Sequence, residues 1–472
     1  MRKGFEKVLL IGVDAAAWNL VLPLVKAGKL PNIKRIMANG VYGNLTTIDP
    51  TLSPVIWTCI ATGKVKEKHG IDGFITEIEG KEIPLTSNMR KAKAIWNIFS
   101  TQGKSVSVVG WWNTWPAEQV NGTMISSYVK ERIRLGKGYI YPDIPHQTYP
   151  PELLDEIGSL LQSGEKDGQK AFHRMFNGIP ESILNPTLER ALENIKLNFI
   201  RDRTFTQISL YLQKSYAPDF LTVYLGGVDN VGHRFWKYMQ PNALNFQVSR
   251  KEQEVFGSII PNYYQYIDQA IGRLVDGCTK NTMIVIVSDH GMRATFPYGE
   301  DGNTGTHRGD DPGIFIISGP NIRRLRYNAL INNFQNAMRI FMARHVERRI
   351  WLFDDAEWYR TIQLWQGNNH IASKKRLALG FMGNFLGKIG LMKHVSIFDI
   401  APTILYALGL AVARDMDGRV ITEIFTSDFL KSHPVLYTDS YEEEEEMMDD
   451  QTAIESVVDE AIVERLKGLG YL

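Results

Sequence analysis

The sequence predicts an α/β fold in which a mostly parallel central sheet carries helices on both faces. Three apolar runs rich in β-branched residues are typical of buried strands, namely "VLLIGV" at 8–13, "FLTVYL" at 220–225 and "MIVIV" at 283–287. Segments with helical spacing lie between such runs, at 23–39, 91–102 and 262–276. This alternation favours parallel strands, because each helix returns the chain to the edge where the next strand begins.

Length and composition set limits on the architecture and on the partners. A chain of 472 residues can form one large domain with insertions, or two domains. With 44% hydrophobic and 22% charged residues and a net charge of +1, the composition is that of a soluble globular protein, and we expect no nucleic-acid partner. Two cysteines make no disulfide framework, and no apolar run has the length of a signal-peptide core or a membrane span. We therefore expect a cytoplasmic protein.

Two segments depart strongly from the neutral total. Residues 321–394 contain thirteen Lys/Arg against four Asp/Glu, a local charge of +9, and mix these basic residues with large apolar ones at roughly helical spacing. Residues 439–472 contain twelve Asp/Glu against two Lys/Arg, a local charge of −10. The basic segment fits a lid on its own domain, an oligomer contact or a peripheral contact with a membrane surface. The acidic segment is expected to be a C-terminal tail.

Acidic side chains and histidines follow the three strand-like runs at the points where these runs end. Asp14 follows the first run, Asp229 and His233 follow the second, and Asp289 and His290 follow the third. Ligands of parallel α/β sheets bind at the carboxyl ends of the strands, so we expect one shared site. His307, in "GNTGTHRGD", lies in a similar glycine-flanked context. Carboxylate and imidazole ligands suit zinc or manganese, and the set is large enough for two metal ions.

Two further stretches carry candidate site residues. In "TLSPVIWTCIATG" a short helix is expected after Pro54, which would place Thr58 near its N-terminus, where backbone N–H groups favour a phosphate. Thr58 is the candidate nucleophile, since a metal ion can activate its hydroxyl; the alternative is a plain helix cap. In "GWWNTWP", Trp112 and Asn113 are candidate substrate-binding residues, although tryptophans in such a stretch are as often packing residues.

The ordered set of motifs resembles one known family. "VLLIGVDAAAWNL", "SPVIWTCIATGKVKEKHGI", "YLGGVDNVGH", "VSDHGM", "GTHRG" and "VSIFDIAPTILYALGL" are similar, in this order, to the type I phosphodiesterase/nucleotide pyrophosphatase branch of the alkaline phosphatase superfamily. The resemblance implies an alkaline-phosphatase-like catalytic domain over 1–438, with a cap insertion at about 126–200, a lid-like insertion at about 321–394 and an acidic tail over 439–472.

The resemblance also implies a mechanism. One metal ion would be held by Asp229, His233 and His307, and a second by Asp14, Asp289, His290 and the Thr58 oxygen. Thr58 would attack phosphorus and form a phospho-threonine intermediate. This implies a metal-dependent phosphoric ester hydrolase, foremost a phosphodiesterase, with zinc expected and manganese as the alternative.

The segment "HGIDGF" departs from the family pattern, because it lacks the asparagine that binds phosphate in nucleotide pyrophosphatases. Nucleotide diesters are therefore doubtful substrates. Two alternatives stay open: a phospho- or phosphoalcohol transferase acting on a lipid or glycan, and a metal-binding regulatory protein without turnover.

Overall fold

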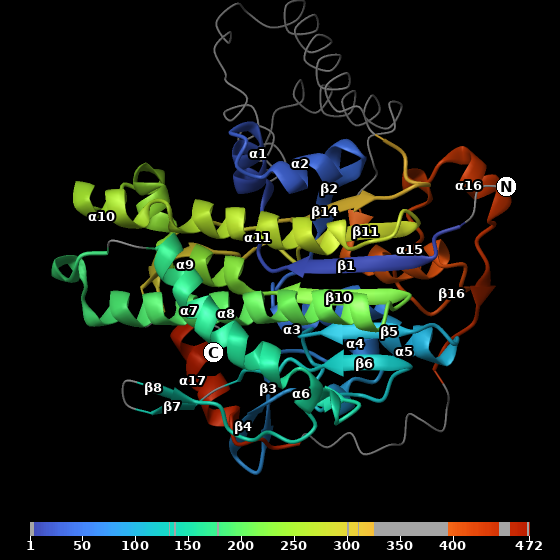
Figure 1. Cartoon of the computed structure of the whole chain (residues 1–472), viewed down its shortest axis with the longest axis horizontal. Coiled ribbons are helices and arrows are strands. Elements are labelled where there is room, and N and C mark those ends of the chain that lie inside the picture. Colours follow the sequence, from blue (N-terminus) through green and yellow to red (C-terminus); the bar gives the residue numbers. More distant parts are fainter. Residues whose placement is uncertain are drawn as a thin grey trace, which may run out of the picture.

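The computed structural model describes residues 4–131, 133–135, 138–176, 179–299, 302–309, 311–324, 395–442, 454–469 and 472. A nine-stranded sheet forms the centre of the molecule (Figure 1), in the order β15-β2-β14-β11-β1-β10-β5-β6-β9. Its strands are β1 (Lys7–Val13), β2 (Gly40–Thr46), β5 (Val106–Val109), β6 (Gly122–Ile125), β9 (Thr148–Tyr149), β10 (Phe220–Leu225), β11 (Thr282–Val287), β14 (Gly313–Ser318) and β15 (Val395–Ser396).

The centre of this sheet is parallel, as the sequence predicted. β11, β1, β10, β5 and β6 are parallel neighbours, whereas β14 runs antiparallel to both β11 and β2, and β9 runs antiparallel to β6. Parallel strands need both faces covered, because their side chains alternate between two buried faces. In β1, Leu9 and Ile11 belong to one hydrophobic core and Val8 and Leu10 to the other.

Helices cover both faces, which confirms the predicted α/β class. The core that contains Leu9 is closed by α1 (Trp18–Lys26), α2 (Pro31–Ala38), α7 (Gly158–Met175), α8 (Pro186–Ser215), α9 (Gly227–Met239) and α11 (Ile259–Asp276). The core that contains Leu10 is closed by α3 (Ser53–Thr62), α5 (Ile95–Thr101) and α15 (Ile400–Ala407). The smaller elements are α4 (Lys66–His69), α6 (Leu153–Glu156), α10 (Arg250–Phe256), α16 (Ser427–Ser432), α17 (Asp459–Leu469), β3 (Ile75–Ile78), β4 (Lys81–Pro84), β7 (Ile133–Leu135), β8 (Gly138–Ile140), β12 (Arg293–Tyr298), β13 (Asn303–Thr306), β16 (Val412–Ala413) and β17 (Tyr437–Thr438).

The structure corrects two expected helices. The segment expected as one helix at 23–39 forms α1 and α2, which are separated at Ala27–Leu30; Gly28 takes a left-handed φ of 72° and Pro31 begins the second helix. The helix of the "SPVIW" stretch begins at Ser53, before Pro54 and not after it. All ten residues of this helix are buried, so no apolar periodicity marks where it begins.

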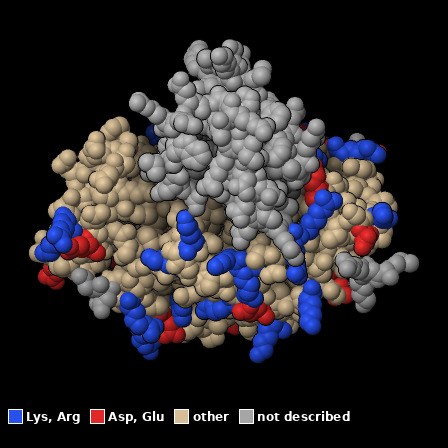
Figure 2. All heavy atoms as spheres, turned by 90° about the horizontal axis from the view of Figure 1, so that it is seen from above, with Lys and Arg blue, Asp and Glu red and all other residues tan. Residues whose placement is uncertain are grey.

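Most of the predicted cap lies within the described residues, whereas most of the predicted lid lies outside them. Of the predicted lid at 321–394, residues 325–394 lie outside the described part of the chain. The predicted cap at 126–200 contains the β7–β8 hairpin, β9, which joins the central sheet, and α7, which packs on α8. On the face drawn in Figure 2, Lys and Arg side chains are spread over the part drawn in colour, with Asp and Glu side chains among them. Within the described ranges, no helix has the length and apolar character to cross a bilayer.

The described parts of the acidic tail pack on the rest of the protein. Glu442 accepts a hydrogen bond from the buried ammonium group of Lys64 at 2.8 Å. Helix α17 packs on β4, and its residues Ile462 and Leu466 share a small apolar cluster with Phe74 and Tyr128. The tail is therefore acidic in composition, yet its helix contributes to the packed structure.

A buried ion-pair network joins α17 to the body of the protein, and we expect it to contribute strongly to stability. The carboxylate of Glu131 accepts from Arg201 at 2.9 Å and from Arg465 of α17 at 2.8 Å, with its side chain 3% exposed. Glu131→Ala would leave two arginines without their partner, so we expect a loss of about 3–5 kcal/mol in the free energy of unfolding. Urea unfolding of the purified variant measures this loss.

A matched control lies on the same helix. The ion pair between Lys467 and Glu82 has side chains 50% and 44% exposed, so Lys467→Ala should cost only about 0–1 kcal/mol. Equal losses for the two variants would mean that the Glu131 network contributes no more to stability than a surface pair.

Candidate active site

The predicted acids and histidines lie at one edge of the sheet because the strands before them are parallel neighbours. Asp14 is the first residue after β1, Asp289 and His290 are the second and third residues after β11, and Asp229 is the third residue of the helix that follows β10. His233 lies one turn further along α9, and His307 follows β13. All six residues are at most 5% exposed. The sheet topology therefore brings to one buried place side chains that are up to 293 positions apart.

One group of ligand atoms forms at the ends of β1 and β11. Nε2 of His290 lies 3.2 Å from Oδ2 of Asp289 and 3.5 Å from Oδ1 of Asp14. The other oxygen of Asp14 accepts from the Tyr224 hydroxyl at 2.5 Å and from Nε1 of Trp57 at 3.3 Å. Asp14 Oδ1, Asp289 Oδ2 and His290 Nε2 are buried, and none of them makes a hydrogen bond with the described residues. Three buried ligand atoms thus converge with no protein donor between them.

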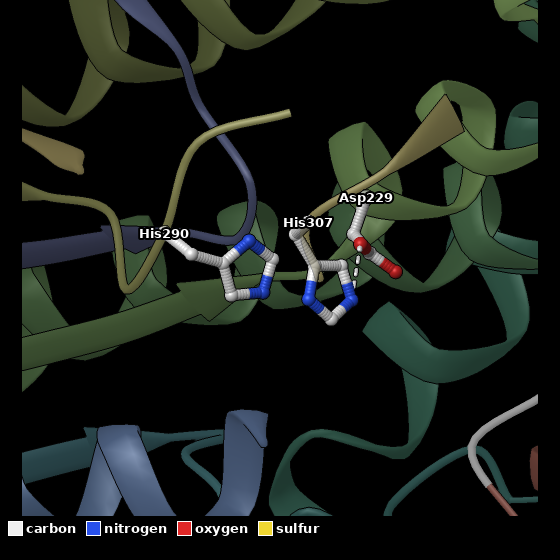
Figure 3. Close-up of side chains that lie close together, drawn as sticks. All are labelled: Asp229, His290 and His307. Atoms are coloured by element: carbon white, nitrogen blue, oxygen red, sulfur yellow. Dashed lines mark ion pairs between the residues drawn. The ribbon is translucent and has the colours of Figure 1, made fainter. Parts of the chain in front are cut away.

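A second group forms around Asp229. Nε2 of His233 lies 3.0 Å from Oδ1 of Asp229, and Nε2 of His307 lies 3.9 Å from the same oxygen. Figure 3 shows the His307 ring between Asp229 and His290, and the two imidazoles stack with a centroid distance of 3.8 Å. The ligand atoms of Asp229, His290 and His307 lie within 4.8 Å of one another, as do those of Asp14, Asp289 and His290. His290 therefore belongs to both groups, whereas the family resemblance implied that it binds one metal ion.

The Nδ1 atoms of the three histidines face backbone carbonyl or hydroxyl oxygens. Nδ1 of His233 faces the Gly305 carbonyl at 3.0 Å, and Nδ1 of His290 faces that of Gly291 at 3.1 Å. Nδ1 of His307 lies 2.9 Å from the Thr51 hydroxyl, which donates its own proton to the His307 carbonyl. The Tyr298 hydroxyl also lies 2.8 Å from Nδ1 of His233 and 3.2 Å from the Gly305 carbonyl oxygen. Because a carbonyl only accepts, the contact with Gly291 places a hydrogen on Nδ1 of His290, and the contacts of the other two rings are compatible with the same tautomer.

In this tautomer the lone pair of each Nε2 points at carboxylate oxygens. Such an arrangement needs a positive charge between the nitrogen and the oxygens, which either a proton or a metal ion can supply. In metal sites, histidine ligands are held in the same way, through a hydrogen bond from the nitrogen that does not bind the metal. The donor set of carboxylate oxygens and imidazole nitrogens fits divalent zinc or manganese.

The electrostatics of the group also favour a cation. Burial raises the pKa of Asp14 well above its usual range, and the charges of Asp289 and Asp229 raise it further. Burial raises the pKa of Asp289 as well. Burial also acts to raise the pKa of Asp229, but the charge and hydrogen bond of His233 outweigh it and bring that pKa below the usual range. Burial lowers the pKa of His307 well below its usual value, which keeps this imidazole neutral at pH 7 and able to bind a metal.

The position of Thr58 differs from the expected one. Thr58 is the sixth residue of α3, and its hydroxyl donates to the Pro54 carbonyl at 2.7 Å, a bond back along the same helix. It is therefore not beside the helix N-terminus. Within the described residues, no hydrogen bond joins its hydroxyl to the six predicted acids and histidines.

A different hydroxyl begins this helix. Ser53 is the first residue of α3 and is 3% exposed. Two residues before it, Thr51 contacts His307, and four residues after it, Trp57 donates to Asp14. The chain from 51 to 57 therefore passes beside both ligand groups, and Ser53 lies within this stretch. A serine directly before the proline of a helix start was the sequence signal that could have singled it out.

The two predicted substrate-binding residues differ in their contacts. The Trp112 ring packs edge-to-face on Tyr224, the residue that donates to Asp14, with a centroid distance of 6.1 Å. Asn113 is buried in a left-handed conformation with φ 52°, and its Nδ2 donates to the Leu85 carbonyl at 3.0 Å. Trp112 is therefore close enough to line the site, whereas the amide nitrogen of Asn113 is already bound to the backbone.

Comparison with known proteins adds one finding to this geometry. A sequence model of "Type I phosphodiesterase / nucleotide pyrophosphatase" matches residues 8–306, which carry all the predicted ligands except His307 at the very next position. The chain belongs to this family. Membership of this family places the protein among the phosphoric ester hydrolases, as the sequence predicted. No curated protein sequence matches it.

Several solved structures are similar to this protein at low sequence identity. Phosphonoacetate hydrolase from Sinorhizobium meliloti matches with 16% identity and a TM-score of 0.40, and the match covers 64% of this chain and 59% of the hydrolase. Murine ectonucleotide pyrophosphatase/phosphodiesterase 5 matches with 12% identity and a TM-score of 0.38, covering 68% and 89%. An alkaline phosphatase variant matches with 12% identity and a TM-score of 0.47, covering 90% of this chain and 100% of its own.

Proposed function

We propose that the protein hydrolyses phosphoric diesters, with two divalent metal ions held by its buried acids and histidines and a hydroxyl of α3 as the nucleophile. One observation carries the proposal: the lone pair of His290 Nε2 lies 3.2 Å from Oδ2 of Asp289 and 3.5 Å from Oδ1 of Asp14, and these buried oxygens make no hydrogen bond within the described residues. A site without a cation would pair lone pairs with anions in a buried place, which is strongly unfavourable.

The residues divide naturally into two ligand sets. Asp14, Asp289 and His290 would hold one ion, and Asp229, His233 and His307 the other, with His290 close enough to serve either. Bound metal ions would polarise the phosphoryl oxygens and stabilise the attacking and leaving oxygens. The residues around them keep the ligands oriented: Tyr224 and Trp57 fix Asp14, and Thr51 fixes His307.

The nucleophile is proposed to come from the first two turns of α3. Attack by its hydroxyl on phosphorus would form a new O–P bond, break one ester bond and release the alcohol with the hydroxyl proton; water would then hydrolyse the phospho-enzyme. Sequence reasoning chose Thr58. Two observations favour Ser53: it begins the helix, where free N–H groups attract a phosphate, and the hydroxyl of Thr58 is bonded to Pro54.

The two candidate substrate-binding residues bear on the substrate class. Trp112 beside Tyr224 would form part of the pocket wall, and Asn113 could contact phosphate only through its Oδ1, since its nitrogen binds Leu85. A small phosphate ester, or a lipid or glycan ester, fits this site. The location is proposed to be cytoplasmic, which agrees with two cysteines that form no disulfide, Cys59 and Cys278. Membrane contact through 321–394 stays a prediction, since 325–394 lie outside the described residues.

One assay separates this function from its alternatives. We expect the metal-free protein to be inactive, and zinc or manganese to restore hydrolysis of bis-p-nitrophenyl phosphate faster than that of p-nitrophenyl phosphate. Faster turnover of the monoester would show that the protein is a phosphatase and not a diesterase. Release of nitrophenol that rises with added alcohol acceptors would indicate a transferase, and no turnover with either metal would leave a regulatory metal-binding protein.

A further inference from the structure

Asp202, on helix α8, is a buried carboxylate with no role in the proposed chemistry. It is 2% exposed and forms no ion pair with any described residue. Its Oδ1 accepts from the Gly226 N–H at 3.1 Å, and its Oδ2 accepts from the Gly227 N–H at 3.0 Å and from the Tyr263 hydroxyl at 2.8 Å. Burying a charge among neutral donors is unfavourable, so its retention here needs a reason.

The two N–H groups that Asp202 binds belong to the start of the ligand-bearing helix. Gly226 is the N-cap residue of α9 and Gly227 its first residue, and no side chain of α9 itself caps this end. Asp229 is the third residue of the helix and His233 the seventh, so both project from the two turns that Asp202 anchors. Helix α9 is therefore capped by a neighbouring helix through both oxygens of one carboxylate.

The sequence makes space for this contact. A Cβ atom on Gly227 would lie 1.7 Å from the Tyr263 hydroxyl and 2.7 Å from Oδ2 of Asp202. Only glycine lets the backbone of the β10–α9 turn approach the carboxylate this closely. Asp202, Tyr263 and Gly227 thus pack together at the start of the helix that carries Asp229.

We propose that Asp202 is a positioning residue of the active site: by holding the Gly226 and Gly227 N–H groups it sets the direction in which Asp229 and His233 face the other ligands. The inference rests on the proposed metal-binding function. Asparagine in its place would offer one acceptor oxygen but turn an NH₂ group toward the other backbone N–H. Asp202→Asn should therefore tilt the start of α9 without changing side-chain volume.

A second buried aspartate supplies a matched control. Asp268, on α11, is 1% exposed and accepts from the Asn32 and Ile33 N–H groups at 3.2 and 2.7 Å. It thereby caps α2, which carries none of the proposed ligands. Asp268→Asn removes the same kind of contact from the same hydrophobic core, so a purely structural role would give the two variants the same behaviour.

The test measures zinc affinity of the full-length protein by competition with a chromophoric chelator. We expect Asp202→Asn to weaken binding about 10- to 100-fold, as loss of an outer-shell partner does, and Asp268→Asn to leave it within about threefold. Tyr263→Phe, which keeps both backbone bonds, should fall between them. In the diester assay, kcat of Asp202→Asn should fall with little change in KM, and excess zinc should restore part of it. Unchanged affinity in Asp202→Asn would overturn the proposal.

Hydrogen exchange separates this inference from the proposed function. In the metal-free protein, the backbone amides at the start of α9 should exchange faster in Asp202→Asn than in Asp268→Asn or the wild type. If the wild type bound no zinc, the proposed function would be wrong. Hydrogen exchange would still show whether Asp202 holds the start of α9. Equal exchange at α9 in all three proteins would refute the positioning role by itself.

Discussion

Asp229→Ala is expected to lose one metal ion and nearly all diesterase activity while the fold survives. The Asp229 carboxylate faces both His233 and His307, so its removal leaves two imidazoles without the anion between them. The loss in activity should be at least about 100-fold, beyond the range typical of outer-shell partners. Metal content by mass spectrometry and circular dichroism on the same sample measure occupancy and fold together.

His290→Ala should have the larger effect on metal content. Its Nε2 belongs to both candidate groups, so we expect it to retain less metal than Asp229→Ala. His173 is an exposed histidine on α7, and His173→Ala serves as the control with full occupancy and activity. Full occupancy in both Asp229→Ala and His290→Ala would show that the ligand assignment is wrong.

Ser53→Ala is expected to abolish the phospho-enzyme and lower kcat by at least about 10³-fold, the order at which deletion of a nucleophile acts. Both metal ions should stay bound, since the carboxylate and imidazole groups of the two ligand sets are unchanged. Ser53→Thr, which keeps a hydroxyl, should retain part of the activity. Acid quenching during turnover, followed by peptide mass spectrometry, measures the intermediate and locates the phosphate.

Thr58 variants provide the opposing test. Thr58→Val preserves shape but removes the bond to the Pro54 carbonyl, which should cost about 1 kcal/mol in stability and leave the phospho-enzyme intact. Phosphate found on Thr58, with partial activity in Thr58→Ser, would restore the assignment made from the sequence. That result would require the hydroxyl to leave Pro54 during the reaction.

The sequence alone predicted that these acids and histidines would meet at one edge of the sheet, because metal chemistry and sheet geometry leave a local pattern. A buried strand that ends in "SDH" or "GVD" places acids where only a cation or a helix start can satisfy them. Since parallel strands share their carboxyl edge, strands known only as apolar runs were enough to predict that Asp14, Asp229 and Asp289 would meet. The pairing of β1 with β10 and β11 confirms that arrangement.

Other features could be decided only by the tertiary structure. The start of α3 had no periodic signature because all of its residues are buried, and this misplaced Thr58 relative to the helix N-terminus. The cap on α9 comes from Asp202, 24 positions before the Gly226 that it binds, so no local motif announces it. The physical reason is the same in both cases: local patterns record contacts with solvent and with chain neighbours. Contacts between buried elements distant in sequence depend on how those elements pack.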